Sequence, residues 1–307
     1  MIGADRGDMA RKISKFLADI EWAESAGLDT AWMPQVPDDF DVLTMVSLMG
    51  SRTTRIELGT AVVPLQAQHP VALARQALSV HAGAGGRLAL GVGPSHHWIV
   101  RDMLGVPYEK PAAYTRDYLE VLNAALAGPG DVDVENDNFT VHNPTVLGAD
   151  SPMPVLVAAL GPVMLQIAGE LTDGTVLWMA DERAIGDHIA PRINKAAADA
   201  GRPAPRIVAG IPVCLCENSR IEEAKERANR ILAEAETLDA NGNLPLSTRR
   251  CRGPMGWIRW KLTRSCRRRM IPPCVSSTRW RRSSRASSTS TTSPGSTSRL
   301  PSRLTGR

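Results

Sequence analysis

Short apolar runs alternate with amphipathic stretches along most of this chain, and that alternation constrains the fold more than any other feature of the sequence. The runs are apolar enough to be covered on both faces, which is typical of parallel strands. Strands that alternate with helices are typical of units in which a helix crosses over the sheet to the next parallel strand. We expect strands at residues 29–33, 56–63, 87–92, 155–159, 174–178 and 207–213.

The amphipathic stretches fill the intervals between these strands. Residues 12–26, for example, place Ile13, Phe16 and Ile20 at helical spacing and stop at Gly27. Residues 132–141 interrupt the alternation with a pattern typical of a β-hairpin that has a polar turn. The remaining helices are expected at residues 70–81, 114–126, 184–200 and 221–238.

The strand count favours an incomplete barrel. With the N-terminal segment counted as the remnant of a first strand, the chain supplies seven strands, whereas a complete (β/α)8 barrel has eight. We therefore predict an α/β fold of the TIM-barrel type, in which the first strand is clipped and the eighth strand is missing. The 307 residues are enough for one such barrel.

The end of the chain differs from the rest in charge. Residues 240–307 contain 16 Lys and Arg and no acidic residue, whereas residues 1–239 contain 20 basic and 32 acidic side chains. Uncompensated charge with low hydrophobicity predicts disorder. We predict a barrel domain at residues 1–238 and a disordered basic Ser/Arg-rich tail at 239–307. A shifted reading frame explains this tail better than a nucleic-acid-binding arm, because the neighbouring frame of 279–295, written with GC-rich codons, can encode a helix followed by a strand.

Several function classes find no support in the sequence. No apolar run approaches the roughly 20 residues that span a bilayer, and we expect a cytoplasmic protein without a signal peptide. The five cysteines have no zinc-site spacing, and we interpret Cys214 and Cys216 as small apolar strand residues. The patterns GxGxxG, HExxH and a nucleophile elbow are absent.

Three strand ends carry residues that suit a bound cofactor. Gly59-Thr60-Ala61 would let a flat ring approach the backbone, and the alternative is a plain strand end. Residues 91–97, Gly-Val-Gly-Pro-Ser-His-His, form a glycine-rich turn of the kind that holds anions, although a lone histidine is more often structural. Residues 158–162, Ala-Ala-Leu-Gly-Pro, form a second turn, where Pro162 suits the first helical position and the alternative is a simple helix start.

Five segments in this order resemble the luciferase-like monooxygenase superfamily, and specifically its actinobacterial branch of deazaflavin (F420)-dependent oxidoreductases. The resemblance covers roughly residues 1–238. It implies a (β/α)8 barrel whose cofactor lies at the C-terminal mouth of the strands, where the active sites of such barrels lie. The segments are AGLDTAWMPQ (26–35), RIELGTAVVPLQAQHP (55–70), GGRLALGVGPSHHWIV (85–100), PVLVAALGPVMLQIAGELTDGTVLWM (154–179) and GRPAPRIVAGIPVCL (201–215).

The resemblance also implies roles for individual residues. A bulge at Gly59 and Thr60 supports the face of the ring in relatives, and Gly93 and Ser95 belong to a loop beside the cofactor. The second turn holds the cofactor's phosphate-bearing chain through backbone N–H groups, which points to Ala159, Leu160, Gly161 and Met164. The candidates for catalysis are His96, Gln35 and Trp178, and no metal ligand is expected. Gln35 and Trp178 are candidates because the topology places them at the barrel mouth, where Trp178 would either wall the substrate pocket or be a core or rim aromatic.

The predicted function is hydride transfer between coenzyme F420 and an organic substrate. The alternatives are an FMN-dependent monooxygenase that uses O2, an inactive frameshifted product, and a nucleic-acid-associated protein acting through the tail. The expected partner is a small-molecule substrate that the sequence does not name. A membrane partner is not expected, and a homodimer is left open.

Overall fold

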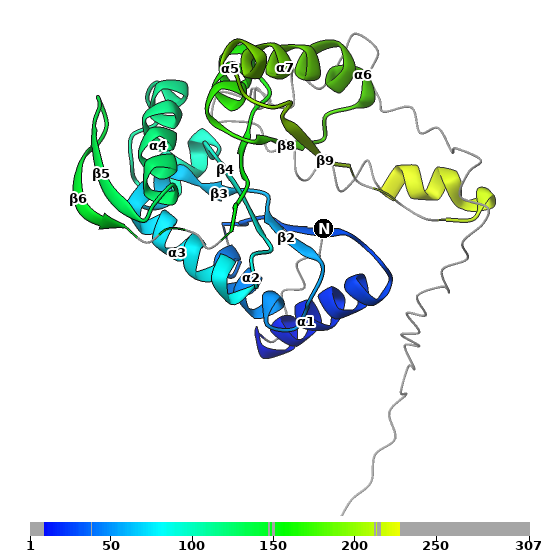
Figure 1. Cartoon of the computed structure of the whole chain (residues 1–307). Coiled ribbons are helices and arrows are strands. Elements are labelled where there is room, and N and C mark those ends of the chain that lie inside the picture. Colours follow the sequence, from blue (N-terminus) through cyan, green and yellow to red (C-terminus); the bar gives the residue numbers. More distant parts are fainter. Residues whose placement is uncertain are drawn as a thin grey trace, which may run out of the picture. The chain divides into compact units, whose positions relative to one another are not determined.

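The computed structural model of the chain describes residues 9–37, 39–146, 148, 151–211, 213 and 216–227. Its main feature is a parallel sheet with strand order β1-β2-β4-β7-β8-β9, in which β3 also pairs with β4 (Figure 1). All neighbouring strands of this sheet run parallel, as expected. The strands are β1 Thr30–Met33, β2 Glu57–Thr60, β3 Val63–Pro64, β4 Leu88–Gly93, β7 Val155–Ala158, β8 Gly174–Trp178 and β9 Arg206–Gly210.

The strand predictions are confirmed with two differences. The expected strand at 56–63 is divided into β2 and β3, with Ala61 and Val62 between them, and the last expected strand stops at Gly210. Among the described residues, β1 and β9 are the two ends of the sheet and do not pair with each other. The sheet is therefore an open part of a barrel. The predicted first-strand remnant within residues 1–8 and the tail at 239–307 lie outside the described residues.

Helices connect these strands. The expected helix at 184–200 is interrupted by a π-helical turn, and the helix that precedes β2 was not expected from the sequence. That helix, α2, buries Leu43, Met45, Val46 and Met49, so it lacks the polar face that reveals an amphipathic helix. The helices are α1 Met9–Ser25, α2 Val42–Gly50, α3 Pro70–Gly83, α4 Pro111–Leu126, α5 Pro162–Leu171, α6 Glu182–Ala184 and α7 Ala190–Asp199, with π-helical turns η2 Ile99–Met103 and η3 Ile185–Ile189 and 3-10 turns η1 Leu65–Ala67 and η4 Asn218–Arg220.

The start of β4 is fastened to α2 and β2 by one side chain. Arg87 donates hydrogen bonds to the carbonyl oxygens of Gly50 (2.9 Å), Thr53 (2.7 Å) and Ile56 (2.8 Å), and to the Thr53 hydroxyl (3.0 Å). Two of these carbonyls, at the end of α2 and just after it, would otherwise lack partners. This single side chain therefore links the end of α2 and the residue before β2 to the residue before β4.

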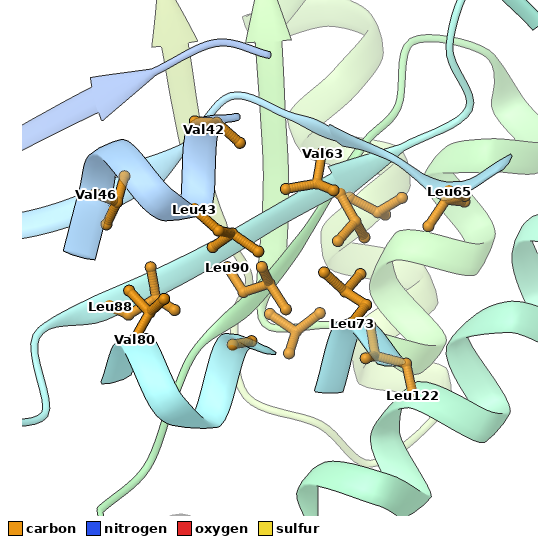
Figure 2. Close-up of a cluster of buried hydrophobic side chains, with 14 of the residues drawn as sticks. Val42, Leu43, Val46, Val63, Leu65, Leu73, Val80, Leu88, Leu90 and Leu122 are labelled. Atoms are coloured by element: carbon orange, nitrogen blue, oxygen red, sulfur yellow. The ribbon is translucent and has the colours of Figure 1, made fainter. Parts of the chain in front are cut away.

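Two hydrophobic clusters cover the two faces of the sheet. In the larger cluster, α2, α3 and α4 pack Leu43, Leu73 and Leu122 against Leu88 and Leu90 of β4 (Figure 2). The smaller cluster lies on the inner face. There the buried Ala89, Leu156 and Val176 contact half-buried Trp32 from β1 and Val208 from β9. Because β1 and β9 are the opposite ends of the strand order, their contact with one cluster shows that the sheet is curled.

The expected hairpin is present as β5 Gly130–Glu135 and β6 Thr140–Val146, an antiparallel pair that lies beside α4 (Figure 1). Phe139 attaches it to the body. The ring of Phe139 lies 5.5 Å from those of His69 and Tyr114 and 5.7 Å from that of Tyr118, measured between centroids. The hairpin is thus held against the N-terminal ends of α3 and α4.

Candidate functional site

A β-bulge lies at the C-terminal end of β2. Gly59 pairs with Ala89 of β4, but Val63 pairs with Val92, so four steps along one strand match three along the other. The extra residue lies in Ala61–Val62, whose peptide bond is cis. Bulges redirect side chains at the rims of barrels, and this one directs the chain out of the β2–β4 ladder at the mouth.

Gly59 and Thr60 directly precede this bulge and pack against other parts of the protein. A methyl group at Gly59 would lie 2.2 Å from Cε3 of Trp32, so the flat ring that approaches Gly59 is the protein's own indole. The buried Thr60 hydroxyl donates to the Gly91 carbonyl (2.7 Å) and accepts from the Gly91 N–H (2.8 Å). Both residues face protein, and it is the following pair, Ala61 and Val62, that is partly exposed.

Small residues bring three strand ends together beside the bulge. A methyl group at Gly93 would lie 2.8 Å from Cβ of Ala158 and 3.1 Å from Cγ2 of Val62. The ends of β4, β7 and the bulge therefore touch without long side chains between them. A surface of this kind lets a planar group lie close to the backbone.

The loop after β4 presents a hydroxyl and an imidazole. Tyr108 fixes the loop by donating to the carbonyl of Ser95 (2.9 Å), while the Ser95 hydroxyl has no partner among the described residues. The exposed His96 ring stacks on Trp98, with centroids 6.3 Å apart and planes 14° apart, and makes no hydrogen bond within the described chain. Desolvation and, secondarily, the neighbouring His97 hold the pKa of His96 below its usual value of 6.5. Both effects favour the neutral imidazole.

The turn after β7 leads into α5 without a side-chain cap. Pro162 occupies the first helical position, as predicted, and Gly161 is the N-cap residue. In the part of the chain that the structure describes, the N–H groups of Val163 and Met164 have no hydrogen-bond partner. The Leu160 carbonyl accepts a hydrogen bond from Nε2 of His188 (2.9 Å). Nothing in the sequence pattern had singled out His188, because its place depends on the π-helical turn η3.

The other residues of this turn point inward. Ala159 is buried, and the Leu160 and Met164 side chains pack against the larger cluster. Leu160, Met164 and Gly161 can therefore contribute only backbone groups to a ligand at the mouth. The backbone role that the resemblance implies for them stays a prediction.

Gln35 differs from the other candidates because its side chain already makes hydrogen bonds to the backbone. Its Oε1 accepts from the N–H of Val42 (2.8 Å), and its Nε2 donates to the carbonyls of Val36 and Phe40 (3.3 Å each). Because both ends of the amide serve the loop that leads into α2, the geometry favours a positioning role over the predicted catalytic one. Trp178, in contrast, ends β8 with 47% of its surface exposed.

Two other features of the sequence can be located. Cys216 is a free, exposed thiol, so its interpretation as a packed strand residue is wrong, and Cys214 lies outside the described residues. Within the described ranges, no three His, Cys, Asp or Glu side chains gather as a metal site would require. Nor does any described helix have the length and apolar character to cross a membrane.

The sequence profile of one protein family matches almost the whole described chain. The profile of the luciferase-like monooxygenases aligns with residues 2–257. The chain belongs to the luciferase-like monooxygenase family. This membership confirms the predicted family and, at the level of the family, the predicted enzyme class of oxidoreductases. The match continues past residue 238, where we expected the barrel domain to end.

The curated relatives of this luciferase-like protein include a reductase and a putative F420-dependent oxidoreductase. It is 26% identical over 211 residues to a 5,10-methylenetetrahydromethanopterin reductase of Methanolobus tindarius, covering 69% of this chain and 64% of the reductase. It is 32% identical over 165 residues to a putative coenzyme F420-dependent oxidoreductase of Mycobacterium tuberculosis, covering 50% of this chain and 47% of that protein. The chain thus matches about half to two thirds of the length of these relatives.

Solved structures confirm the fold of this luciferase-like chain. The coenzyme F420-dependent tetrahydromethanopterin reductase of Methanopyrus kandleri is 24% identical with a TM-score of 0.57, covering 64% of this chain and 61% of that one. The monooxygenase RslO1 of Streptomyces bottropensis is 22% identical with a TM-score of 0.66, covering 76% of each chain. The predicted barrel-type α/β fold is therefore confirmed in the described part.

Proposed function

We propose that this chain transfers a hydride between coenzyme F420 and an organic substrate at the C-terminal ends of β2, β4 and β7. The proposal rests on one observation above all. The three features that a ring with a phosphate-bearing chain would need follow the C-terminal ends of the adjacent strands β2, β4 and β7: a small-residue surface, a pair of polar side chains and an uncapped helix N-terminus. Family membership restricts the cofactor to a deazaflavin or a flavin, and the M. tuberculosis relative favours F420.

The donors available at the mouth fit such a cofactor. Val163 and Met164 offer N–H groups at the positive end of α5, where a phosphate is stabilised by about 1–2 kcal/mol. Gly161, as an uncapped N-cap residue, leaves that end open. The Ala61–Val62 bulge and Gly93 would lie against the ring. Bound F420 supplies or accepts the hydride, and the protein binds and orients it.

The two polar side chains after β4, those of Ser95 and His96, have different roles in this proposal. The Ser95 hydroxyl can donate a hydrogen bond to a carbonyl oxygen of the ring. The lowered pKa of His96 favours the neutral imidazole, which can take up a proton at one ring nitrogen and release one from the other. Trp98 stacks on the ring of His96 and limits its rotation. We assign Ser95 to orientation and His96 to proton handling.

Equilibrium titration of the full chain with F420 and, separately, with FMN tests the proposal. We expect tighter binding of F420, followed by its fluorescence. The variant Ser95→Ala should weaken F420 binding severalfold, since one hydrogen bond contributes about 0.5–1.5 kcal/mol. Ser79→Ala is the matched control, because the Ser79 hydroxyl donates only to the Arg75 carbonyl within its own helix.

Tighter binding of FMN would overturn the cofactor assignment and favour the monooxygenase alternative. Absence of binding by either cofactor in a folded chain would overturn the site itself. Thermal unfolding of the same preparation, monitored by circular dichroism, distinguishes that result from an unfolded sample.

A further inference from the structure

Two tryptophans of the sheet lie over glycines of the adjacent strand. Trp32 of β1 pairs in register with Gly59 of β2, and Trp178 of β8 pairs in register with Gly210 of β9. A methyl group at Gly59 would lie 2.2 Å from Cε3 of Trp32, and one at Gly210 would lie 2.9 Å from Cε3 of Trp178. Each indole therefore occupies the space that a side chain on the neighbouring strand would otherwise fill.

Trp178 lies on the inner face of the curled sheet. Side chains alternate between the faces of a strand. In β8, Val176 belongs to the inner cluster and Leu177 to the outer core, so Trp178 returns to the inner side. As the last residue of its strand, it stands at the same mouth as Gly93 and Ala158 of β4 and β7.

The outer faces of the two indoles differ. The guanidinium carbon of Arg206 lies 5.3 Å from the ring centroid of Trp32, so that indole is covered on both sides. No aromatic or cationic group of the described residues stacks on Trp178, and 47% of the residue is exposed. Gly210 holds the second indole in place and leaves its other face open at the mouth.

In the described part of the chain, the residues that follow β8 and β9 bring no unpaired cation to Trp178 for an anionic ligand. The chain continues from β8 as Met179-Ala180-Asp181, and the Asp181 carboxylate accepts the Ala184 N–H at the start of α6 (2.6 Å). Arg183 pairs with Asp187 (3.6 Å). After β9 comes Ile211, which is 48% exposed. Asp181, Arg183 and Asp187 are thus engaged with one another or with the backbone, whereas the free hydrogen-bond donors lie on the β4–β7 flank.

We infer that Trp178 is the substrate platform of this enzyme and that it selects an uncharged substrate with a planar, apolar ring. An aromatic face offers a planar ring stacking energy beyond the apolar area that it buries. Among the described residues, a phosphorylated or carboxylated substrate would find no unpaired cation next to Trp178 and would lose hydration. The inference rests on the proposed function, since it assigns the substrate class of the same mouth.

Three probes of matched size test the substrate class on the full chain by calorimetric titration. These are 2-acetonaphthone, which is planar and uncharged, 2-naphthoate, which has the same ring and a negative charge, and 2-acetyldecahydronaphthalene, which is uncharged but not planar. We expect 2-acetonaphthone to bind most tightly. Trp178→Ala should weaken its binding about tenfold, and Trp178→Phe should restore most of the affinity. Trp22→Ala, at an exposed tryptophan of α1, is the control that should change nothing.

The titrations are made with and without F420, so that the two proposals fail separately. Equal affinity of wild type and Trp178→Ala for 2-acetonaphthone, or preference for 2-naphthoate, would overturn the platform. Loss of F420 binding in Trp178→Ala would assign Trp178 to the cofactor instead and would also overturn it. If F420 never binds but 2-acetonaphthone depends on Trp178, only the proposed cofactor fails.

Discussion

Arg206 at the start of β9 and Glu57 at the start of β2 form a two-point ion pair inside the curl of the sheet. Nη1 lies 3.0 Å from Oε2, and Nη2 lies 2.8 Å from Oε1. Three strands, β4, β7 and β8, separate these two in the sheet order. The pair thus spans the interior and links two strands that share no backbone hydrogen bond.

Replacing one member of this pair should cost more than replacing both. Both side chains are about one-third exposed, so screening reduces the effect. We expect Arg206→Met to lower the free energy of unfolding by roughly 1–2 kcal/mol, because it leaves the Glu57 carboxylate without a partner. The double variant with Glu57→Leu should recover part of that loss. Urea unfolding in a double-mutant cycle measures the coupling, and additive effects would contradict it.

Glu24 should contribute to the acid sensitivity of the fold. Its carboxylate accepts the N–H groups of Thr54 (3.0 Å), Arg55 (2.6 Å) and Ile56 (2.9 Å), and these bonds hold the pKa of Glu24 below the usual 4.5. A lowered folded-state pKa gives stability that is present above pH 4.5 and lost as the pH falls through the folded value. Glu24→Gln should therefore flatten the pH dependence of unfolding below pH 4.5. A slope equal to that of the wild type would refute this.

Gly161→Asp should separate helix stability from cofactor binding. Aspartate at the N-cap can accept the free N–H groups of α5, which favours the fold, but it also brings a negative charge to the proposed phosphate site. We expect F420 affinity to fall about tenfold or more while thermal stability stays the same or rises. Gly161→Asn offers a similar cap without charge and should lose less affinity. Equal losses in both variants would exclude charge as the cause.

Thr60 should affect folding rather than ligand contact. Its buried hydroxyl satisfies both backbone groups of Gly91, so Thr60→Val should lower the free energy of unfolding by about 1–3 kcal/mol. Thr60→Ser keeps the hydroxyl and should retain F420 affinity. Chemical denaturation of both variants, together with F420 titration, measures the two effects. A large loss of affinity in a stable Thr60→Ser variant would show direct contact with the cofactor.

We can predict how His97, the neighbour of His96 after β4, changes the pKa of His96. Because desolvation and His97 both lower the pKa of His96, His97→Gln should raise that pKa without restoring it fully to 6.5. Proton NMR of the imidazole signals across pH 5–8, assigned through the His96→Gln variant, measures the shift. An unchanged pKa would mean that the two rings do not interact electrostatically.

Most of the strand positions could be predicted from the sequence because runs such as Val155–Ala158 are buried on both faces and read as continuous apolar segments. The bulge at Ala61–Val62 could not be predicted, because these two residues are apolar and continue the pattern of an uninterrupted strand. The glycine at position 59 indicated that another group packs closely against the backbone there. The sequence did not indicate that this group is the indole of Trp32. The hydrogen bonds of the Gln35 and Thr60 side chains could not be predicted either, because their partners are distant in the sequence or lie in another element.

The tryptophan–glycine pairs also bear on how strands find their alignment. A slip of two residues keeps every side chain on its own face, so the division of apolar and polar residues does not penalise it. Such a slip would place Trp32 opposite Glu57 or Ala61, and Trp178 opposite Val208 or Pro212, none of which leaves room for an indole as glycine does. In the described sheet, β1 and β9 each pair with a strand on one side only, so fewer contacts determine their register. There the steric fit between each tryptophan and its glycine allows only one register.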